Sequence, residues 1–262
     1  MNILNKKLVF SPRRSGQTVN LSAPIKEVAR STVGEASSMV AFTLAEVLIT
    51  IGIIGVVSAL TIPNLITNYK AKQLRSQFLK SYSLVQQAFK QMEADDVSLN
   101  PQDYPAYTFY KKFMKYFNGA MTCGTNAGGK NIPCFDSSNE KTHEYKLYHG
   151  GYSRFPEVFL DDGQFVLPDG TNIMLENSTR SYILVSVDLN GYGNPPNRWG
   201  YDLFTFEFLD GELRTMGDKG TSYTNLNLYC NKNSTNDVNG IACAHLAKTN
   251  SDYFKDIVKN IK

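Results

Sequence analysis

The stretch Phe42-Thr-Leu-Ala-Glu-Val-Leu-Ile-Thr-Ile-Gly-Ile-Ile-Gly-Val-Val-Ser-Ala-Leu-Thr-Ile62 decides the fold of this chain. Its only charged residue is Glu46, close to its beginning. About 20 helical residues, each rising 1.5 Å, span the roughly 30 Å hydrocarbon core of a bilayer. A carboxylate inside such a helix is costly unless a partner neutralises it. The stretch therefore predicts a membrane-spanning helix in which Glu46 meets a cationic group.

The sequence around Glu46, Ala41-Phe42-Thr43-Leu44-Ala45-Glu46 and the apolar run after it, resembles the cleavage and methylation signal of type IV prepilins and type II secretion pseudopilins. The resemblance implies that a prepilin peptidase cuts between Ala41 and Phe42 on the cytoplasmic side, and that Phe42 is then N-methylated. It also implies that Glu46 pairs with the amino terminus of a neighbouring subunit. An ammonium and a carboxylate brought together in low dielectric largely cancel the cost that each carries alone.

Two further residues match the pattern of the family, and one departs from it. Gly55 and Pro63 stand where pilins often carry residues that loosen the helix. Since proline lacks an N–H group, Pro63 predicts a kink or a local opening, and Gly55 adds backbone freedom. The residue before the cut is Ala41 instead of the usual Gly. A secretory signal is disfavoured because the apolar run is too long for one, whereas a plain anchor leaves Glu46 unexplained.

The charge of the chain is concentrated in residues 1–41, the expected leader. Six cations and two acids give this segment a net charge of +4, against +3 for the whole chain. The basic total is therefore no nucleic-acid signature. Because four cations also follow the span, charge does not set its orientation, and the cytoplasmic amino terminus follows from the resemblance. Met39 offers an alternative start of the chain.

The sequence predicts four regions: a leader (1–41, removed), a transmembrane and polymerisation half-helix (42–63), an amphipathic half-helix (64–92) and a globular head (93–262). In the second half-helix, apolar residues recur every three or four positions, which predicts a helix packed on the head and ending near residues 93–96. These residues are Leu74, Phe78, Leu79, Tyr82, Val85, Ala88, Phe89 and Met92. The expected fold class is α+β, a pilin-like lollipop with a long kinked helix.

The head is expected to contain a small antiparallel sheet of four to six strands. Apolar runs cover residues 158–160, 164–167, 172–175, 182–187, 203–208 and 212–215. Asp–Gly pairs between several of them are typical of tight turns, because glycine adopts positive φ at low cost. A short helix is predicted over 111–117, within an otherwise loop-rich segment.

The four cysteines form two local pairs, Cys123 with Cys134 and Cys230 with Cys243, and neither has C-x-x-C spacing. Because the resemblance places the head outside the cytoplasm, disulfides are expected, each adding roughly 3 kcal/mol. Free thiols and metal ligands are the alternatives. The second pair resembles the cysteine-closed carboxyl-terminal region of many pilins, which is often a contact surface.

A calcium site is a hypothesis for the loop after residue 187. Asp188, Asn190, Asn194 and Asp202 place side-chain oxygens in a Gly-rich loop, and calcium takes six to eight oxygen ligands. Major pseudopilins hold calcium in a loop of the head. The EF-hand spacing fails, however, because Trp199 stands in place of the bidentate Glu, and Asx turns explain the same residues. No other cofactor is expected.

No catalytic motif surrounds the histidines His143, His149 and His245, so the chain is not expected to be an enzyme. The resemblance implies a structural subunit of a type IV pilus or of a type II secretion pseudopilus. Its partners would be copies of itself or other pilins, prepilin peptidase and the assembly platform of the inner membrane. The head would lie in the periplasm or at the cell surface. The alternative is a membrane-anchored extracytoplasmic binding protein, an adhesin or a DNA-uptake component, that does not polymerise.

Overall fold

The computed structural model describes residues 42–125, 133–135, 145–150, 157–177 and 182–260. Ala41 and the leader lie outside these residues, as does His143. The chain divides into two compact units, Met1–Thr50 and Ile51–Lys262, and the described part of the first is only the beginning of a helix. The second unit contains the rest of that helix and the whole head.

The longest element is helix α1 (Leu44–Ala94), which is unbroken across Gly55 and Pro63. Pro63 therefore does not open the helix, although it removes one backbone N–H donor. Before Ala71 the described residues of α1 have no buried side chain. From Ala71 onward one face is buried, and the helix ends at Ala94, as the sequence predicts.

The buried face of α1 follows the predicted spacing, except that Tyr82 is only partly buried and Leu79 is exposed. Its buried residues are Ala71, Leu74, Phe78, Ser81, Val85, Ala88, Phe89 and Met92. The prediction for Leu79 is wrong, since this side chain is 42% exposed. Leu79 directly follows Phe78, and consecutive helical residues point about 100° apart. Phe78 takes the core position, with its ring centroid 4.9 Å from that of Phe204.

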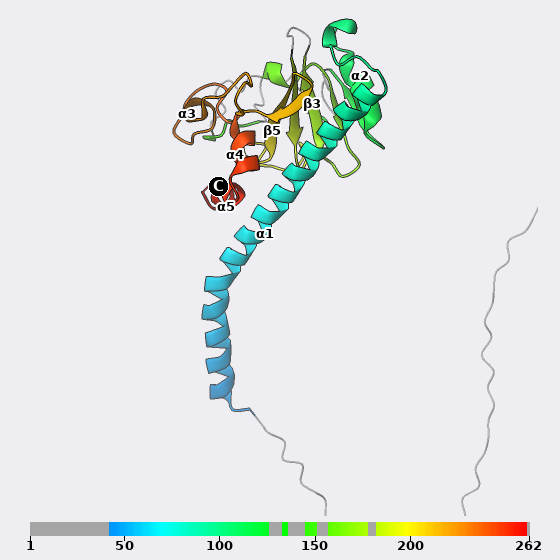
Figure 1. The fold of residues 1–262 in the computed structure, drawn as a ribbon. Coiled ribbons are helices and arrows are strands. Elements are labelled where there is room, and N and C mark those ends of the chain that lie inside the picture. The colour runs from blue at the N-terminus through cyan, green and yellow to red at the C-terminus, as the bar shows by residue number, and fades with distance from the viewer. Residues whose placement is uncertain (1–41, 126–132, 136–144, 151–156, 178–181, 261–262) are drawn as a thin grey trace, which may run out of the picture. The chain divides into compact units, whose positions relative to one another are not determined.

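Six strands form one antiparallel sheet in sequence order (Figure 1). The strands are β1 (Met121–Gly124), β2 (Gln164–Val166), β3 (Asn172–Glu176), β4 (Ile183–Asp188), β5 (Leu203–Leu209) and β6 (Glu212–Thr215). The predicted meander is thus confirmed. Two details differ: β1 was not predicted, and residues 158–160 are no strand, because the 3₁₀ helix η3 (Glu157–Phe159) occupies that position. Asp210 and Gly211 both have positive φ, as a tight hairpin turn requires.

Alternate residues of β5 show what covers the two faces of the sheet. Phe204, Phe206 and Phe208 point toward α1, where Phe208 stacks on Phe89 with ring centroids 4.2 Å apart. On the other face Thr205 accepts a hydrogen bond from the indole of the buried Trp199. Both faces are therefore buried, which explains why β4 is buried along its whole length.

The remaining helices are short and surround the sheet (Figure 1). They are η1 (Pro101–Asp103), α2 (Phe109–Phe113), η2 (Met114–Tyr116), α3 (Leu226–Tyr229), α4 (Cys243–Thr249) and α5 (Tyr253–Asn260). The helix predicted over 111–117 thus begins earlier and ends as a 3₁₀ turn. Helices α3, α4 and α5 were not predicted. The carboxyl-terminal region is accordingly more helical than the Cys-closed loop that the sequence suggested.

Candidate functional site

At the beginning of α1, Glu46 and Thr43 bind each other reciprocally. The backbone N–H of Thr43 donates to Glu46 Oε2 over 2.8 Å, and the N–H of Glu46 donates to Thr43 Oγ1 over 3.2 Å. This is a capping box, in which two backbone donors of the first helical turn are satisfied by side chains. Phe42, which precedes it, is 79% exposed. In the single chain Glu46 therefore caps its own helix.

The N-terminal half of α1 presents exposed apolar side chains. Among the described residues, α1 is the one helix long and apolar enough to cross a membrane, and its apolar window is not buried. The predicted long apolar helix is thus confirmed. Its exposed large side chains include Leu48, Ile51, Ile54, Val57, Leu60 and Leu65. An apolar surface of this extent favours lipid or the helices of other proteins over water.

Asp188 and Asp202, two predicted calcium ligands, lie together at one end of the sheet. Asp188 ends β4, and its register partner Leu203 directly follows Asp202. Both carboxylates are fully buried. Asp188 accepts hydrogen bonds from the Tyr145 hydroxyl and from the backbone N–H of Gly191, over 2.8 and 3.0 Å. The loop that joins the two strands thus donates backbone hydrogen bonds to the carboxylate of Asp188.

The amide side chains of this loop supply further oxygen atoms. Asn190 lies against Asp202, while its Oδ1 accepts no hydrogen bond within the described residues. The buried Oδ1 of Asn197 is likewise without a described donor. Asn194 differs: it is exposed, and its amide donates to the carbonyl of Asn190 over 2.7 Å. Of the predicted donors, the structure brings Asp188, Asn190 and Asp202 together, and Asn197 is a better candidate than Asn194.

Two buried carboxylates this close raise the free energy of their charged forms. Burial raises the pKa of both carboxyl groups, and the charge of Asp202 raises the pKa of Asp188 further. A bound divalent cation would offset the repulsion between the two carboxylates. Carboxylate and amide oxygens are the ligands that calcium takes. A calcium ion here would share carboxylate oxygens that already accept hydrogen bonds, from the Tyr145 hydroxyl and from the backbone N–H groups of residues 190, 191, 197 and 198.

A second acidic cluster was missed by the sequence analysis. Carboxylate oxygens of Asp161, Asp162 and Glu176 lie within 4.8 Å of one another. Burial, and after it the charge of Asp162, raise the pKa of Asp161. The signal in the sequence was the Asp161-Asp-Gly163 run, which we interpreted as turn chemistry alone. Glu176 comes from the adjacent strand, and no local pattern connects it to this turn.

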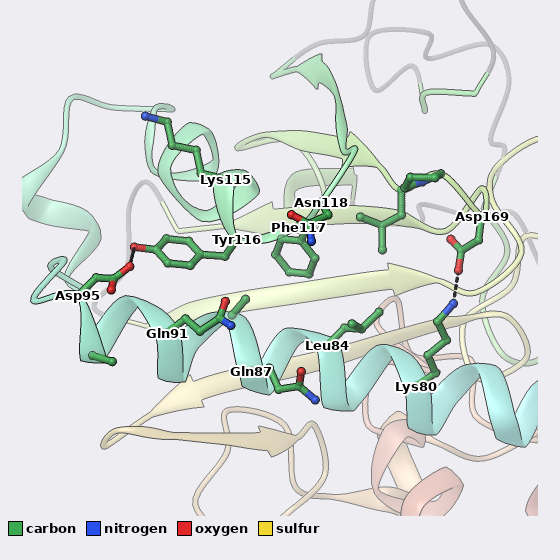
Figure 2. Close-up of a pocket in the computed structure, with 14 residues that line it drawn as sticks. Lys80, Leu84, Gln87, Gln91, Asp95, Lys115, Tyr116, Phe117, Asn118 and Asp169 are labelled. Atoms are coloured by element: carbon green, nitrogen blue, oxygen red, sulfur yellow. Dashed lines mark hydrogen bonds and ion pairs between the residues drawn. The ribbon is translucent and has the colours of Figure 1, made fainter.

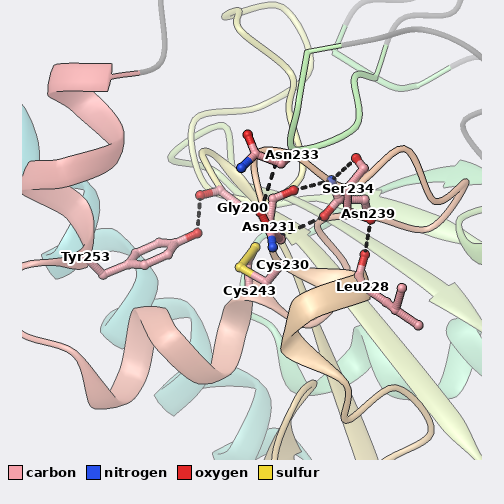
Figure 3. The surroundings of a disulfide bond; sticks show 9 residues. All are labelled: Gly200, Leu228, Cys230, Asn231, Asn233, Ser234, Asn239, Cys243 and Tyr253. Atoms are coloured by element: carbon pink, nitrogen blue, oxygen red, sulfur yellow. Dashed lines mark hydrogen bonds between the residues drawn. A yellow bond between two sulfur atoms is a disulfide. The ribbon is translucent and has the colours of Figure 1, made fainter.

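Both predicted disulfides are present, Cys123–Cys134 and Cys230–Cys243. Figure 3 shows the second bond beside an asparagine-rich loop. Within that loop, Asn239 Nδ2 donates to the carbonyls of Asn231 and Ser234, each over 2.8 Å. The loop is therefore held by side-chain amides as well as by the disulfide, which explains how a segment with few apolar residues keeps one conformation.

An open groove of about 750 Å³ lies between α1 and two segments of the head, residues 115–118 and 167–169 (Figure 2). One end is closed by an ion pair between Lys80 and Asp169, with 2.6 Å between nitrogen and oxygen. At the other end the hydroxyl of Tyr116 donates to Asp95 over 3.1 Å. The groove is the seam at which the head meets the helix, and polar contacts fix both of its ends.

Comparison of the chain with protein-family models, with curated proteins and with solved structures found no match.

Proposed function

We propose that this chain is a type IV pilin-like structural subunit, cut between Ala41 and Phe42, that polymerises through the apolar half of α1. The observation that carries the proposal is the division of α1. Its second half supplies core residues to the head, whereas the half before Ala71 exposes its apolar side chains. Such a helix leaves lipid only when the helices of other copies replace the lipid around it.

The proposal gives Glu46 a role in assembly in addition to its capping box. In the single chain the carboxylate is held by its own Thr43, at the end of the helix where backbone N–H groups favour negative charge. Cutting before Phe42 creates a positive amino terminus. On assembly, the amino terminus of a neighbouring copy pairs with Glu46 and adds a cation to the contacts that Thr43 already makes.

The proposed partners are other copies or other pilins, prepilin peptidase and an assembly platform in the inner membrane. The subunit begins as a single-pass protein of that membrane with its head outside the cytoplasm. Pilin and pseudopilin are two versions of this proposal. Genes for a secretion apparatus beside this one would favour the pseudopilin, and genes for a pilus would favour the pilin.

The test is to express the chain with and without a prepilin peptidase. Mass spectrometry should find a mature chain that begins with N-methylated Phe42, only when the peptidase is present. Glu46→Ala should be cut normally yet enter filaments poorly, whereas the exposed Glu212→Ala should behave like the wild type. Incorporation of Glu46→Ala at the wild-type level contradicts the assembly role. A processed chain that forms no filament favours the anchored binding protein.

A second function, binding of calcium by the head, is favoured by the unpaired oxygens of Asn190 and Asn197 beside two buried acids. Saturation at about 100 times the dissociation constant would stabilise the head by about 2.7 kcal/mol. We expect calcium to raise the melting temperature of the detergent-solubilised chain. Asp202→Asn should abolish the rise, and the exposed Asp237→Asn should keep it. Calorimetric titration without heat, together with an unchanged melting temperature, would remove this function.

A further inference from the structure

Several cations lie directly beyond the apolar half of α1, and the proposed assembly assigns them no role. Lys70 and Lys72 are exposed, and Arg75 is partly exposed. Ile66 is the last large aliphatic residue of the exposed stretch. With a rise of 1.5 Å per residue, Lys70 lies about 6 Å and Arg75 about 14 Å beyond Ile66 along the helix axis. The positive charge therefore begins where the apolar surface ends.

Helix α5 adds two cations at the same level of α1. The Arg75 guanidinium donates to the carbonyls of Asn250 and Ser251, just before α5, each over 3.4 Å. Figure 1 shows α5 beside α1. The buried face of α5 holds Tyr253, Phe254 and Ile257, whereas Lys255 and Lys259 are exposed and one turn apart. The contacts of Arg75 with residues 250 and 251, and of Phe78 with Phe254, thus fix the beginning of α5 against α1.

We name these residues the juxtamembrane cation cluster: Lys70, Lys72, Arg75, Lys255 and Lys259. Within the described residues none of them forms an ion pair, whereas Lys80 and Lys90 on the same helix are paired with Asp169 and Glu93. Asp252 and Asp256 are also exposed here, which leaves the region with a net charge of +3. The cluster is therefore a surface of net positive charge.

The dimensions match the edge of a bilayer. Headgroup regions add about 5–8 Å on each side of the hydrocarbon core. Measured from Ile66, Lys70 falls at this depth, and Lys72 and Arg75 lie about 3 and 8 Å further along the helix axis. Tyr69, which is 68% exposed, is of the residue type that gathers at such interfaces. Lysine stems lie along apolar surface while the ammonium groups reach anionic headgroups.

We propose that the juxtamembrane cation cluster binds anionic phospholipid headgroups and seats the head on the membrane surface before the subunit assembles. The inference rests on the membrane-spanning helix of the proposed function. It adds a partner, the lipid surface itself, and a contact through α5 that the apolar helix alone does not provide. Polymerisation would have to break this contact, because extraction from the bilayer moves the cluster away from the headgroups.

The test compares hydrogen exchange of the full-length chain in two kinds of nanodisc, one copy per disc. One disc contains phosphatidylcholine only, and the other contains about 30% phosphatidylglycerol. We expect amides of residues 250–260 to exchange at least about threefold more slowly in the anionic disc, and the difference to disappear in about 0.5 M NaCl. Lys255→Gln/Lys259→Gln should lose most of this slowing. Lys111→Gln/Lys112→Gln, which removes the same charge from exposed positions on α2, should keep it.

Equal exchange of residues 250–260 in the two discs would overturn the inference. It would also be overturned if the anionic disc slowed exchange equally in the Lys255/Lys259 variant and in the Lys111/Lys112 variant. Slowing in the neutral disc as well would point to apolar contact and would also overturn it. Residues 47–63 report on the membrane span separately. Their protection in both discs leaves the proposed function standing when the cluster fails, whereas free exchange there removes the span and the lipid contact together.

Discussion

Gly191 is the residue on which the conformation of the 188–202 loop depends most directly. It has a φ of +81°, and its N–H donates to the buried Asp188. A Cβ atom at this position would lie 2.2 Å from the carbonyl oxygen of Gly170, which is backbone and cannot move aside cheaply. The turn at Gly170 and the turn at Gly191 therefore approach so closely that position 191 has no room for a side chain.

We predict that Gly191→Ala destabilises the head by more than about 3 kcal/mol, since the strain of positive φ adds to the clash. Gly124→Ala is the matched control. Gly124 has a φ of +84°, but no described atom lies within 4 Å of its added Cβ. It should cost only about 1–2 kcal/mol. Urea unfolding of both variants measures the difference, and equal losses would show that the close approach to Gly170 has no energetic weight.

Individual side chains were the least predictable part of the candidate sites. Thr43 and Glu46 match the T-x-x-E signature of a capping box, which the structure contains. An intersubunit role was predicted for Glu46 from the sequence, and this capping box was not predicted. Asn194 and Asn197 are equivalent in the sequence, and only the folded loop exposes one and buries the other. Local pattern identifies a loop that is rich in oxygen donors, and the path of the backbone decides which donors face inward.

Helix α1 contacts the sheet and α5 through an aromatic cluster around Phe78. Phe78 is fully buried and lies within 5.8 Å, between ring centroids, of Phe204, Phe206 and Phe254. We predict that Phe78→Ala costs about 3–5 kcal/mol, because it leaves a cavity between α1, the sheet and α5. The neighbouring Leu79→Ala should cost less than about 1 kcal/mol, since that side chain is largely exposed. Thermal or denaturant unfolding tests the pair, and similar losses would contradict the assignment of the buried face.

Periodicity predicted the elements whose pattern is local and missed those defined by distant contacts. The face of α1 repeats over six turns, and five of the six strands lie between clear turn signals. Strand β1 has no such pattern and exists because it pairs with β2. Helix α5 has eight residues, too few for a helix to form alone, and depends on burying Phe254 against Phe78 and Phe204.

The turn between β2 and β3 is tied to α1 by the ion pair of Lys80 and Asp169 (Figure 2). Partial burial acts to raise the pKa of Asp169, but hydrogen bonds from Lys80 and Thr171 outweigh it and lower this pKa below its ordinary value. A carboxyl group with a lowered folded-state pKa stabilises the protein above its unfolded pKa, near 4, and this stabilisation is lost as the pH falls through the folded value.

Asp169→Asn should therefore reduce the free energy of unfolding by up to about 1 kcal/mol at neutral pH, because the pair is partly solvated. The loss should shrink as the pH falls below about 4, the ordinary pKa of an aspartate, and through the lower folded-state pKa. A double-mutant cycle with Lys80→Gln, measured by urea unfolding across this pH range, isolates the coupling between the two side chains. A coupling that does not change with pH would rule out the ion pair as its source.

At the scale of the whole head, two disulfides close loops of nearly equal length in different surroundings. The sequence separations are 11 and 13 residues. Chain entropy therefore predicts about 3 kcal/mol for each bond. Cys230 and Cys243 both belong to the buried core, and Cys243 is the first residue of α4, whereas Cys123 and Cys134 are partly exposed. Loss of the second bond should thus also disturb the packing of the carboxyl-terminal helices.

We predict that Cys230→Ala/Cys243→Ala lowers the free energy of unfolding by clearly more than the roughly 3 kcal/mol expected for Cys123→Ala/Cys134→Ala. The extra loss comes from the space that the sulfur atoms leave in the core. Hydrogen exchange should show faster opening of residues 225–260 in the first variant, and of β1 in the second. Helix α5 follows α4, whose first residue is Cys243. The first variant should therefore also lose the lipid-dependent protection of residues 250–260. Equal losses with unchanged exchange in 225–260 would mean that this disulfide constrains only its own loop and does not hold α4 and α5 on the sheet.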